Sequence, residues 1–358
     1  MESLNKIDNY SELNNYLNNY CKRMDNSKFL LNGLYFYDLT SYLYSFINDK
    51  VSLYNLNTPV GSWQSENNLS SMEVLSIVEE YFGERAPKYK SLFLKAIQDG
   101  TINLNIDRGL DNGFTLLDSE LENVAGLDLE NHLHANCVFN HDYGDPSLLI
   151  HEFFHTLNLD KKGNISLNRS YFTEAISIYF EMDIFNFMLE KGYDSRDIFH
   201  YRLERLIDLY HCCSSMINIF PVLNCFRNIG PINENSFDDM EKLNIFPRPY
   251  KKEDFYNRVE RTKNELLIED ALNPLKIFGY VIGPLLAYYV TDKNSDEMHR
   301  KMINLNDTVN SRTFYDVLED FGIGPSNSTD LRESLKGPLE NEIKRVSIGL
   351  GIKEAKKK

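Results

Sequence analysis

Residues 151–155 read His-Glu-Phe-Phe-His, which has the residue types and spacing of the HExxH motif of zinc hydrolases. Side chains four positions apart lie on one face of an α-helix, so the imidazoles of His151 and His155 can bind the same metal ion. Glu152 points about 100° away around the helix axis, where it can act on water without being a ligand. The simpler alternative is a buried helix whose two histidines only bond to neighbouring groups.

A hydrolytic zinc site uses three protein ligands and keeps one position for water, so a third ligand is expected downstream. Residues 171–181 read as an apolar helix that contains Glu174, 19 residues after His155. A glutamate side chain is normally exposed to solvent. That ordinary role fits poorly with a helix as apolar as this one. We therefore expect Glu174 to be the third ligand. Glu181, on the same face, is the alternative ligand, or it orients a ligand histidine from behind.

Other groups that could do chemistry give weaker signals. His132 and His134 would share one face of a strand, as a metal pair does, but histidines satisfied by ordinary hydrogen bonds are the better explanation. His141 precedes the predicted zinc helix and could line a cleft. The five cysteines, two of them adjacent at 212–213, fit neither a disulfide nor a zinc framework, so a reducing compartment is expected.

Four blocks of the chain resemble the thimet oligopeptidase and oligoendopeptidase F family of zinc peptidases, over roughly residues 136–322. Residues 138–152 resemble that family's strand, loop and zinc helix, and residues 174–181 resemble its third-ligand helix. Residues 278–283 (Phe-Gly-Tyr-Val-Ile-Gly) resemble its tyrosine-bearing segment over the active site. Residues 302–322 resemble its closing stretch, a helix followed by a glycine-containing turn.

The resemblance implies one zinc ion per chain, a peptide substrate and a second catalytic side chain. That side chain is Tyr280, which would donate to the oxygen that becomes negative during attack on the peptide carbonyl. A core tyrosine in an apolar helix is an equal alternative for Tyr280. The chain departs from the family at Phe154, where a glycine is common, and at Phe278, where a further tyrosine is frequent. The loop from His155 to Glu174 is also short for the family.

The elements that must position these residues are mainly helical. Residues 1–105 show helical spacing of apolar side chains, and helices dominate again from residue 146 to about 319. Residues 102–143 are the best candidate for strands, with a hairpin-like turn at residues 111–113. Together with the resemblance, this predicts a mainly α (α+β) fold with a zincin-like catalytic domain. Its small antiparallel sheet would lie beside a long zinc helix, under an oligopeptidase-like deep cleft.

Three segments have a more specific prediction. The most apolar run, residues 277–290, contains Pro284 and is too short to span a bilayer, which favours a buried, kinked helix. Residues 230–250, rich in Pro, Asn and acidic residues, read as a long surface loop. The segment 135–140 could bind an extended substrate as an added strand.

The predicted organisation has three parts: a helical N-terminal region (residues 1–105), a catalytic region (residues 106–325), and a C-terminal helix with a basic tail (residues 326–358). The 358 residues are 42% hydrophobic, enough for a sizeable core. The net charge of −15 and the lack of a basic stripe argue against nucleic-acid binding. Nothing in the pattern indicates the oligomeric state.

The sequence thus predicts a cytoplasmic zinc peptidase with no membrane partner. The N-terminus has no apolar stretch of the secretory kind, although export by a route without such a signal stays open. We expect hydrolysis of peptide bonds, in short peptides, with Glu152 as the base. The alternatives are a selective protease that cuts one protein partner and a catalytically weak, peptide-binding relative. The intact Glu152 counts against the last of these.

Overall fold

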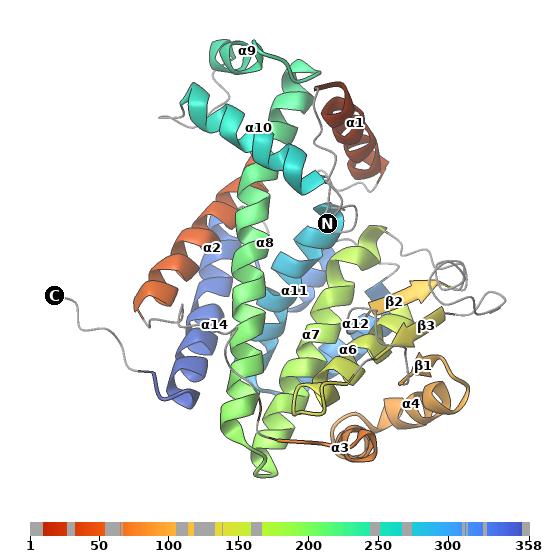
Figure 1. The fold of residues 1–358 in the computed structure, drawn as a ribbon. Coiled ribbons are helices and arrows are strands. Elements are labelled where there is room, and N and C mark those ends of the chain that lie inside the picture. The colour runs from red at the N-terminus through yellow and green to blue at the C-terminus, as the bar shows by residue number, and fades with distance from the viewer. Residues whose placement is uncertain are drawn as a thin grey trace.

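Helices form most of this computed structural model, which describes residues 10–26, 33–53, 65, 67–104, 114–117, 133–137, 139–158, 167–243, 251–266, 274–309, 312, 314–324 and 328–352 (Figure 1). The helices before the sheet are α1 (Tyr10–Asn26), α2 (Gly33–Leu53), α3 (Ser71–Glu84) and α4 (Pro87–Gln98). Those after it are α6 (Asp145–Asn158), α7 (Leu167–Glu190), α8 (Ser195–Ile229), α9 (Ser236–Lys242), α10 (Lys252–Leu266), α11 (Pro274–Lys293), α12 (Asp296–Thr308), α13 (Phe314–Asp320) and α14 (Ser328–Gly349). The basic tail after residue 352 lies outside the described residues.

The described strands form one small sheet at the edge of the helical body (Figure 1). β3 (Leu133–Asn136) is central, between β1 (Ile102–Asn103) and β2 (Phe114–Leu117). β2 pairs antiparallel with β3, but β1 pairs parallel with it. The prediction of a purely antiparallel sheet is therefore wrong, because the sequence pattern of a short strand carries no information on the direction of its partner. The turn predicted at residues 111–113 lies outside the described residues.

For residues 135–137, the central place of β3 corrects the prediction that the segment 135–140 binds a substrate as an added strand. The backbone N–H groups of Ala135 and Cys137 already donate to the carbonyl oxygens of Thr101, just before β1, and of Asn103 in β1. The other edge of β3 is paired along its length with β2. An extended peptide could only join this sheet at one of its outer strands, because every hydrogen-bonding edge of β3 is occupied.

The 35-residue helix α8 runs through the length of the molecule, with α2 and α14 on one side and α6 and α7 on the other (Figure 1). It packs against α2, α10, α11 and α14. By length and composition alone α8 could cross a membrane, yet 56% of its most apolar window is buried inside the fold. A long central helix of a folded domain has the same composition, so this feature alone does not indicate a membrane span.

α11 is the buried helix predicted for residues 277–290. Every residue from 281 to 290 is buried, and Pro284 lies within the helix. Gly283 faces α7: a β-carbon there would lie 2.9 Å from the backbone nitrogen of Ala175 and 2.9 Å from Cβ of Glu174. The missing side chain thus allows α11 to approach α7 closely beside Glu174.

One predicted loop contains a helix. Residues 230–250 were expected to be a surface loop, but α9 occupies residues 236–242 and buries Phe237 and Met240. These two apolar side chains are three positions apart and therefore share one helical face, a signal that the surrounding polar residues obscured. Residues 244–250 lie outside the described residues.

Aromatic side chains pack α6 into the core. Phe153 and Phe154 are fully buried, and Phe154 stacks on Phe180 of α7 with ring centroids 3.9 Å apart and an interplanar angle of 7°. Phe82 of α3 meets Phe153 edge-on at 5.3 Å. The large side chain of Phe154 thus packs between α6 and α7.

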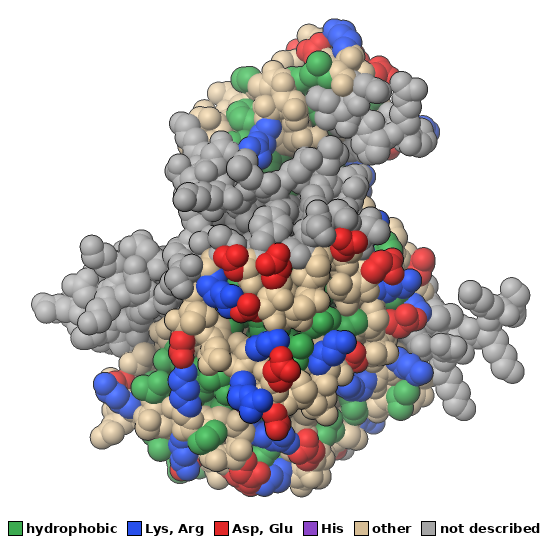
Figure 2. All heavy atoms as spheres, turned by 180° about the vertical axis from the view of Figure 1, so that it is seen from behind, with side chains coloured by type: hydrophobic (Ala, Val, Ile, Leu, Met, Phe, Trp, Pro, Cys, Tyr) green, Lys and Arg blue, Asp and Glu red, His purple; other side chains and the backbone are tan. Residues whose placement is uncertain are grey.

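Acidic and basic side chains are interspersed over the face opposite to the view of Figure 1, as Figure 2 shows. Ion pairs at the surface of the molecule include Lys88 with Asp307 and Lys301 with Glu297. Exposed pairs of this kind contribute little to stability and keep the surface well hydrated.

Candidate metal centre and active site

The entry to α6 is held by one carboxylate. Asp145, the first residue of the helix, accepts hydrogen bonds from the backbone N–H groups of Asn140, His141 and Asp142, at 2.9, 2.7 and 3.2 Å. Asp145 is nearly fully buried. Burial, partly opposed by these donors, raises the pKa of Asp145 to about 6. The turn before α6 is thereby fixed relative to the helix itself.

His141, which the sequence suggested as a cleft-lining residue, contacts the segment before α3. Its Nδ1 lies 2.9 Å from the carbonyl oxygen of Leu69, and its own carbonyl oxygen accepts from the backbone N–H of Leu69 at 2.8 Å. These two contacts join the turn before α6 to the segment before α3. His132 lies outside the described residues, as does the side chain of His134, so the possible pair between them stays a prediction.

The structure brings the three predicted ligands together. Nε2 of His151 and Nε2 of His155 are 2.8 Å apart on α6. On α7, the carboxylate oxygens of Glu174 lie 3.6 Å from His151 Nε2 and 3.5 Å from His155 Nε2. One ligand atom from each residue lies within 4.8 Å of the other two. This largely buried group of two imidazoles and one carboxylate, the metal-ligand cluster, could hold a metal ion.

The spacing of these donors fits a zinc ion. Ligand atoms about 2.1 Å from zinc at tetrahedral angles are about 3.4 Å apart. The two separations from Glu174 to the histidines, 3.6 and 3.5 Å, are close to that value. The imidazole nitrogens, at 2.8 Å, are somewhat closer and have to separate slightly to admit an ion. Two nitrogens and one oxygen are also the donor set of many catalytic zinc sites.

Glu181 lies behind the cluster. Its Oε1 is 2.7 Å from Nδ1 of His151, while Nε2 of the same ring faces Glu174. Arg205 of α8 holds Glu181 through two hydrogen bonds, Nε to Oε2 at 2.9 Å and Nη2 to Oε1 at 2.7 Å. Of the two possibilities left open for Glu181, the contact to Nδ1 favours orientation of His151 over ligation.

The charges around His151 shift its proton affinity. Burial alone would lower the pKa of His151, but the neighbouring carboxylates, with Glu181 foremost, raise it to about 9. Burial would likewise raise the pKa of Glu181, yet Arg205 and then His151 hold it below its ordinary value. The carboxylates around His151 therefore favour its charged form when no metal is bound. A metal ion has to displace the proton on Nε2, because a metal-bound imidazole is neutral.

Glu152 and Tyr280 lie beside the three ligands. Glu152 is 2% exposed, and its Oε1 is 4.0 Å from His151 Nε2. Tyr280 of α11 is hydrogen-bonded to Glu174 through its phenol, and the charge of Glu174, burial and the charge of Glu152 all raise its pKa. Both residues predicted to be catalytic are thus adjacent to the metal-ligand cluster. Their catalytic roles remain predictions.

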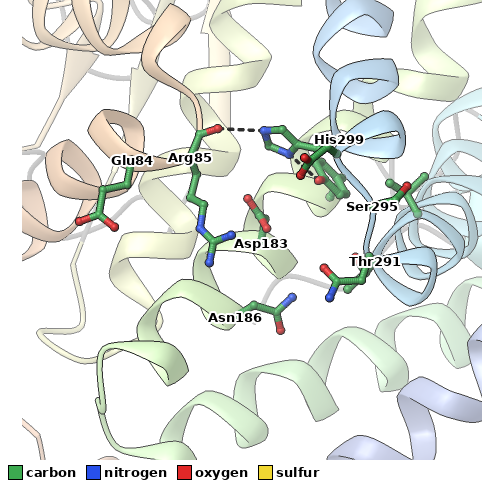
Figure 3. Close-up of a pocket in the computed structure, with 11 residues that line it drawn as sticks. Glu84, Arg85, Asp183, Asn186, Thr291, Ser295 and His299 are labelled. Carbon is green, nitrogen blue, oxygen red and sulfur yellow. Dashed lines mark hydrogen bonds between the residues drawn. The ribbon is translucent and has the colours of Figure 1, made fainter.

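A separate polar pocket of about 240 Å³ lies on the other side of α7 (Figure 3). Tyr179 and Asp183, which line it, are about 140–180° around the helix from Glu174. Tyr179 Oη is 2.7 Å from His299 Nδ1, and His299 Nε2 is 2.9 Å from the carbonyl oxygen of Arg85. No predicted ligand lines this pocket, and the deep cleft expected over the metal-ligand cluster stays a prediction.

Sequence reasoning missed Arg205 and Gly283. Arg205 lies in α8 among other charged residues, Arg202, Glu204 and Asp208, so no local pattern set it apart. Gly283 falls in an otherwise apolar helix, where a glycine usually marks a close approach between backbones. In neither case did the sequence reveal the partner.

Comparisons with known proteins support the fold alone. No protein-family model matches the sequence, and no curated protein sequence matches it. A crystal structure from Chlamydophila abortus, whose description assigns it to the peptidases, matches 95% of this chain and 61% of its own chain, with a TM-score of 0.59 and 11% identity. A structure of PZ peptidase A with an inhibitor matches 85% of this chain and 58% of its own, with a TM-score of 0.47 and 13% identity. The chain spans about three-fifths of either neighbour and shares the fold of a structure described as a peptidase.

Proposed function

We propose that this chain is a zinc-dependent peptidase, with zinc held by His151, His155 and Glu174. The observation that carries the proposal is the convergence of these three side chains within 4.8 Å of one another, beside a buried glutamate. The simpler alternative for residues 151–155, two histidines bonded to unrelated neighbours, does not account for a third donor from α7 at the same point.

Zinc fits this donor set and, when bound, would supply Lewis acidity that lowers the pKa of a coordinated water to about 7 and polarises a carbonyl group. Glu174 contributes the carboxylate that partly neutralises the ion. His151 and His155 contribute neutral imidazoles through Nε2, and Nδ1 of His151 is directed to Glu181.

Glu152 would act as the general base. Its carboxylate is buried next to the cluster and can take a proton from the attacking water, then pass it to the nitrogen of the leaving amine. Because Glu152 follows His151 directly on α6, it lies beside the ligands without pointing along the same line. Exclusion of bulk solvent strengthens its interaction with the reacting groups.

Tyr280 would stabilise the negative charge that develops on the carbonyl oxygen of the substrate. Its phenol donates to Glu174 in the absence of substrate, so it is already directed toward the reacting groups. Its raised pKa keeps the phenol protonated at neutral pH, as a hydrogen-bond donor must be.

The resemblance of residues 136–322 to the thimet oligopeptidase and oligoendopeptidase F family supports short peptides as substrates. The fold shared with a structure described as a peptidase is consistent with this proposal. A protease that acts on one intact protein would use the same residues, so the choice between these two substrates rests on experiment.

Synthetic peptides of graded length, digested by the zinc-loaded protein with and without a chelator, test the proposal. We expect cleavage that stops with the chelator, returns on adding zinc, and falls off above a modest peptide length. Cleavage that is confined to an intact protein would replace the oligopeptidase by a selective protease. Absence of cleavage in a protein that binds zinc stoichiometrically would contradict peptidase activity.

A further inference from the structure

We propose that Arg205 is a positioning residue of the metal centre, acting through Glu181 on the ligand His151. This inference rests on the zinc site of the proposed function. It concerns a third helix, because Arg205 belongs to α8 while Glu181 lies on α7 and His151 on α6. The contacts between these three side chains connect the central helix of the fold to the metal ligands.

The contacts form one continuous chain. Nε and Nη2 of Arg205 donate to the two oxygens of Glu181, at 2.9 and 2.7 Å. Oε1 of Glu181, which receives the shorter of these bonds, is also 2.7 Å from Nδ1 of His151. Nε2 of His151 in turn faces His155 and Glu174. A displacement of the guanidinium group would therefore be passed on to the ligating nitrogen.

The guanidinium group of Arg205 fixes the orientation of the Glu181 carboxylate. The terminal torsion of a glutamate side chain is broad, so its carboxylate plane is not fixed by the chain itself. Two parallel N–H donors of an arginine fix that plane, whereas a lysine presents a single point charge. With the plane fixed, Oε1 stays at Nδ1, and Nε2 of His151 keeps its lone pair directed at the metal position.

The charges near Arg205 support a role at the metal centre. Its side chain is within the field of Glu181 and Glu174, and Asp208 lies 3.4 Å from Nη1. Glu181 is fully buried, and without the arginine its charge would have no cationic partner whenever His151 is neutral. The charge of Arg205 thus stabilises two carboxylates: Glu174, the proposed ligand, and Glu181, which contacts the ligand His151.

A purely structural ion pair is the alternative, and α8 contains one for comparison. Arg202, one turn before Arg205, forms the same kind of bidentate pair with Glu342 of α14, at 2.8 and 2.7 Å. This pair is fully buried, and its arginine also donates to Asn186. Neither Glu342 nor Asn186 belongs to the metal-ligand cluster. A change at Arg202 should therefore affect stability without affecting the metal ligands, which makes Arg202 a control for Arg205.

Zinc affinity, measured by competition with a chromophoric chelator, tests the proposal in Arg205→Lys and Arg202→Lys variants of the full chain. We expect Arg205→Lys to weaken zinc binding on the order of 10-fold, within the range of about 10–100-fold for groups that support metal ligands. Arg202→Lys should lower the unfolding temperature and leave the affinity unchanged. Equal zinc affinity in Arg205→Lys and the wild type would overturn the proposal.

A second comparison tests whether Arg205 acts through Glu181. It measures zinc affinity and therefore does not require peptide hydrolysis. Glu181→Gln should weaken zinc binding by itself, and adding Arg205→Lys to it should cause little further loss. Co²⁺ bound in place of zinc should show an altered visible spectrum in Arg205→Lys but not in Arg202→Lys. Independent, additive losses of zinc affinity in the double variant would contradict the proposal that Arg205 acts through Glu181. A protein that binds zinc normally but does not cleave peptides would contradict only the peptidase function.

Discussion

Gly283 of α11 lies against Glu174 of α7 so closely that a β-carbon on the glycine would be 2.9 Å from Cβ of the glutamate. The same helix carries Tyr280, whose phenol is bonded to the Glu174 carboxylate. Gly283 therefore allows the close approach of the two helices, and Tyr280, about one turn away on α11, contacts the proposed metal ligand Glu174.

Gly283→Ala should push α11 away from α7, because the added carbon meets backbone atoms of Glu174 and Ala175 that cannot rotate aside. We expect a loss of about 1–3 kcal/mol in the free energy of unfolding and weaker zinc binding, as seen in denaturation and chelator competition. Gly337→Ala is the matched control, since nothing lies within 4 Å of a β-carbon at that position of α14. Equal behaviour of the two variants would contradict this packing.

Glu174→Ala should lower the zinc content of the purified protein, because two imidazoles alone leave the ion without a charged ligand. Metal analysis by mass spectrometry measures this directly. Glu190→Ala, at the exposed end of the same helix, should retain a full complement of zinc. A full complement in Glu174→Ala would mean that the third ligand is a different residue.

Tyr280→Phe should reduce kcat by roughly 10²–10³ if the phenol stabilises the developing oxyanion. Steady-state kinetics on a short peptide give this value; they are measured with zinc in saturating amount, because the variant also loses the bond from the phenol to Glu174. An unchanged kcat would return Tyr280 to the alternative considered from the sequence, a tyrosine of the core.

Asp145→Asn should change the pH dependence of stability in a defined direction. The folded protein raises the pKa of Asp145 from 3.8 to about 6, so the folded state holds this proton more tightly than the unfolded chain. The contribution of Asp145 to stability is complete below about pH 3.8 and is lost as the pH rises through about 6. In urea denaturation, the difference between wild type and variant should fall across this interval and then level off. A constant difference would contradict the raised pKa.

The metal-ligand cluster could be predicted because its signals are local. Four-residue spacing places His151 and His155 on one helical face whatever surrounds the helix, and Glu174 stood out as a charge within an apolar run. Burial of α11 followed in the same way from its composition. These features depend on residues close together along the chain.

What the sequence could not predict depends on contacts between distant segments. The parallel pairing of β1 with β3 joins strands far apart in the chain, and a two-residue strand has no periodicity to detect. The bonds from Arg205 to Glu181 and the approach of Gly283 to Glu174 depend on how three helices pack, which local propensity does not encode. Gly283 was visible as a glycine in an apolar helix, but its contact with α7 was not, and Arg205 did not stand out among the charged residues around it.

The most direct test of the account is the parallel measurement of zinc content and peptide hydrolysis in Glu152→Gln. The amide keeps the size of the side chain and cannot accept a proton from water, so we expect wild-type zinc content and a rate lower by about 10²–10⁴. Hydrolysis at the wild-type rate by the zinc-loaded variant would show that Glu152 is not the base and would contradict the proposed peptidase mechanism.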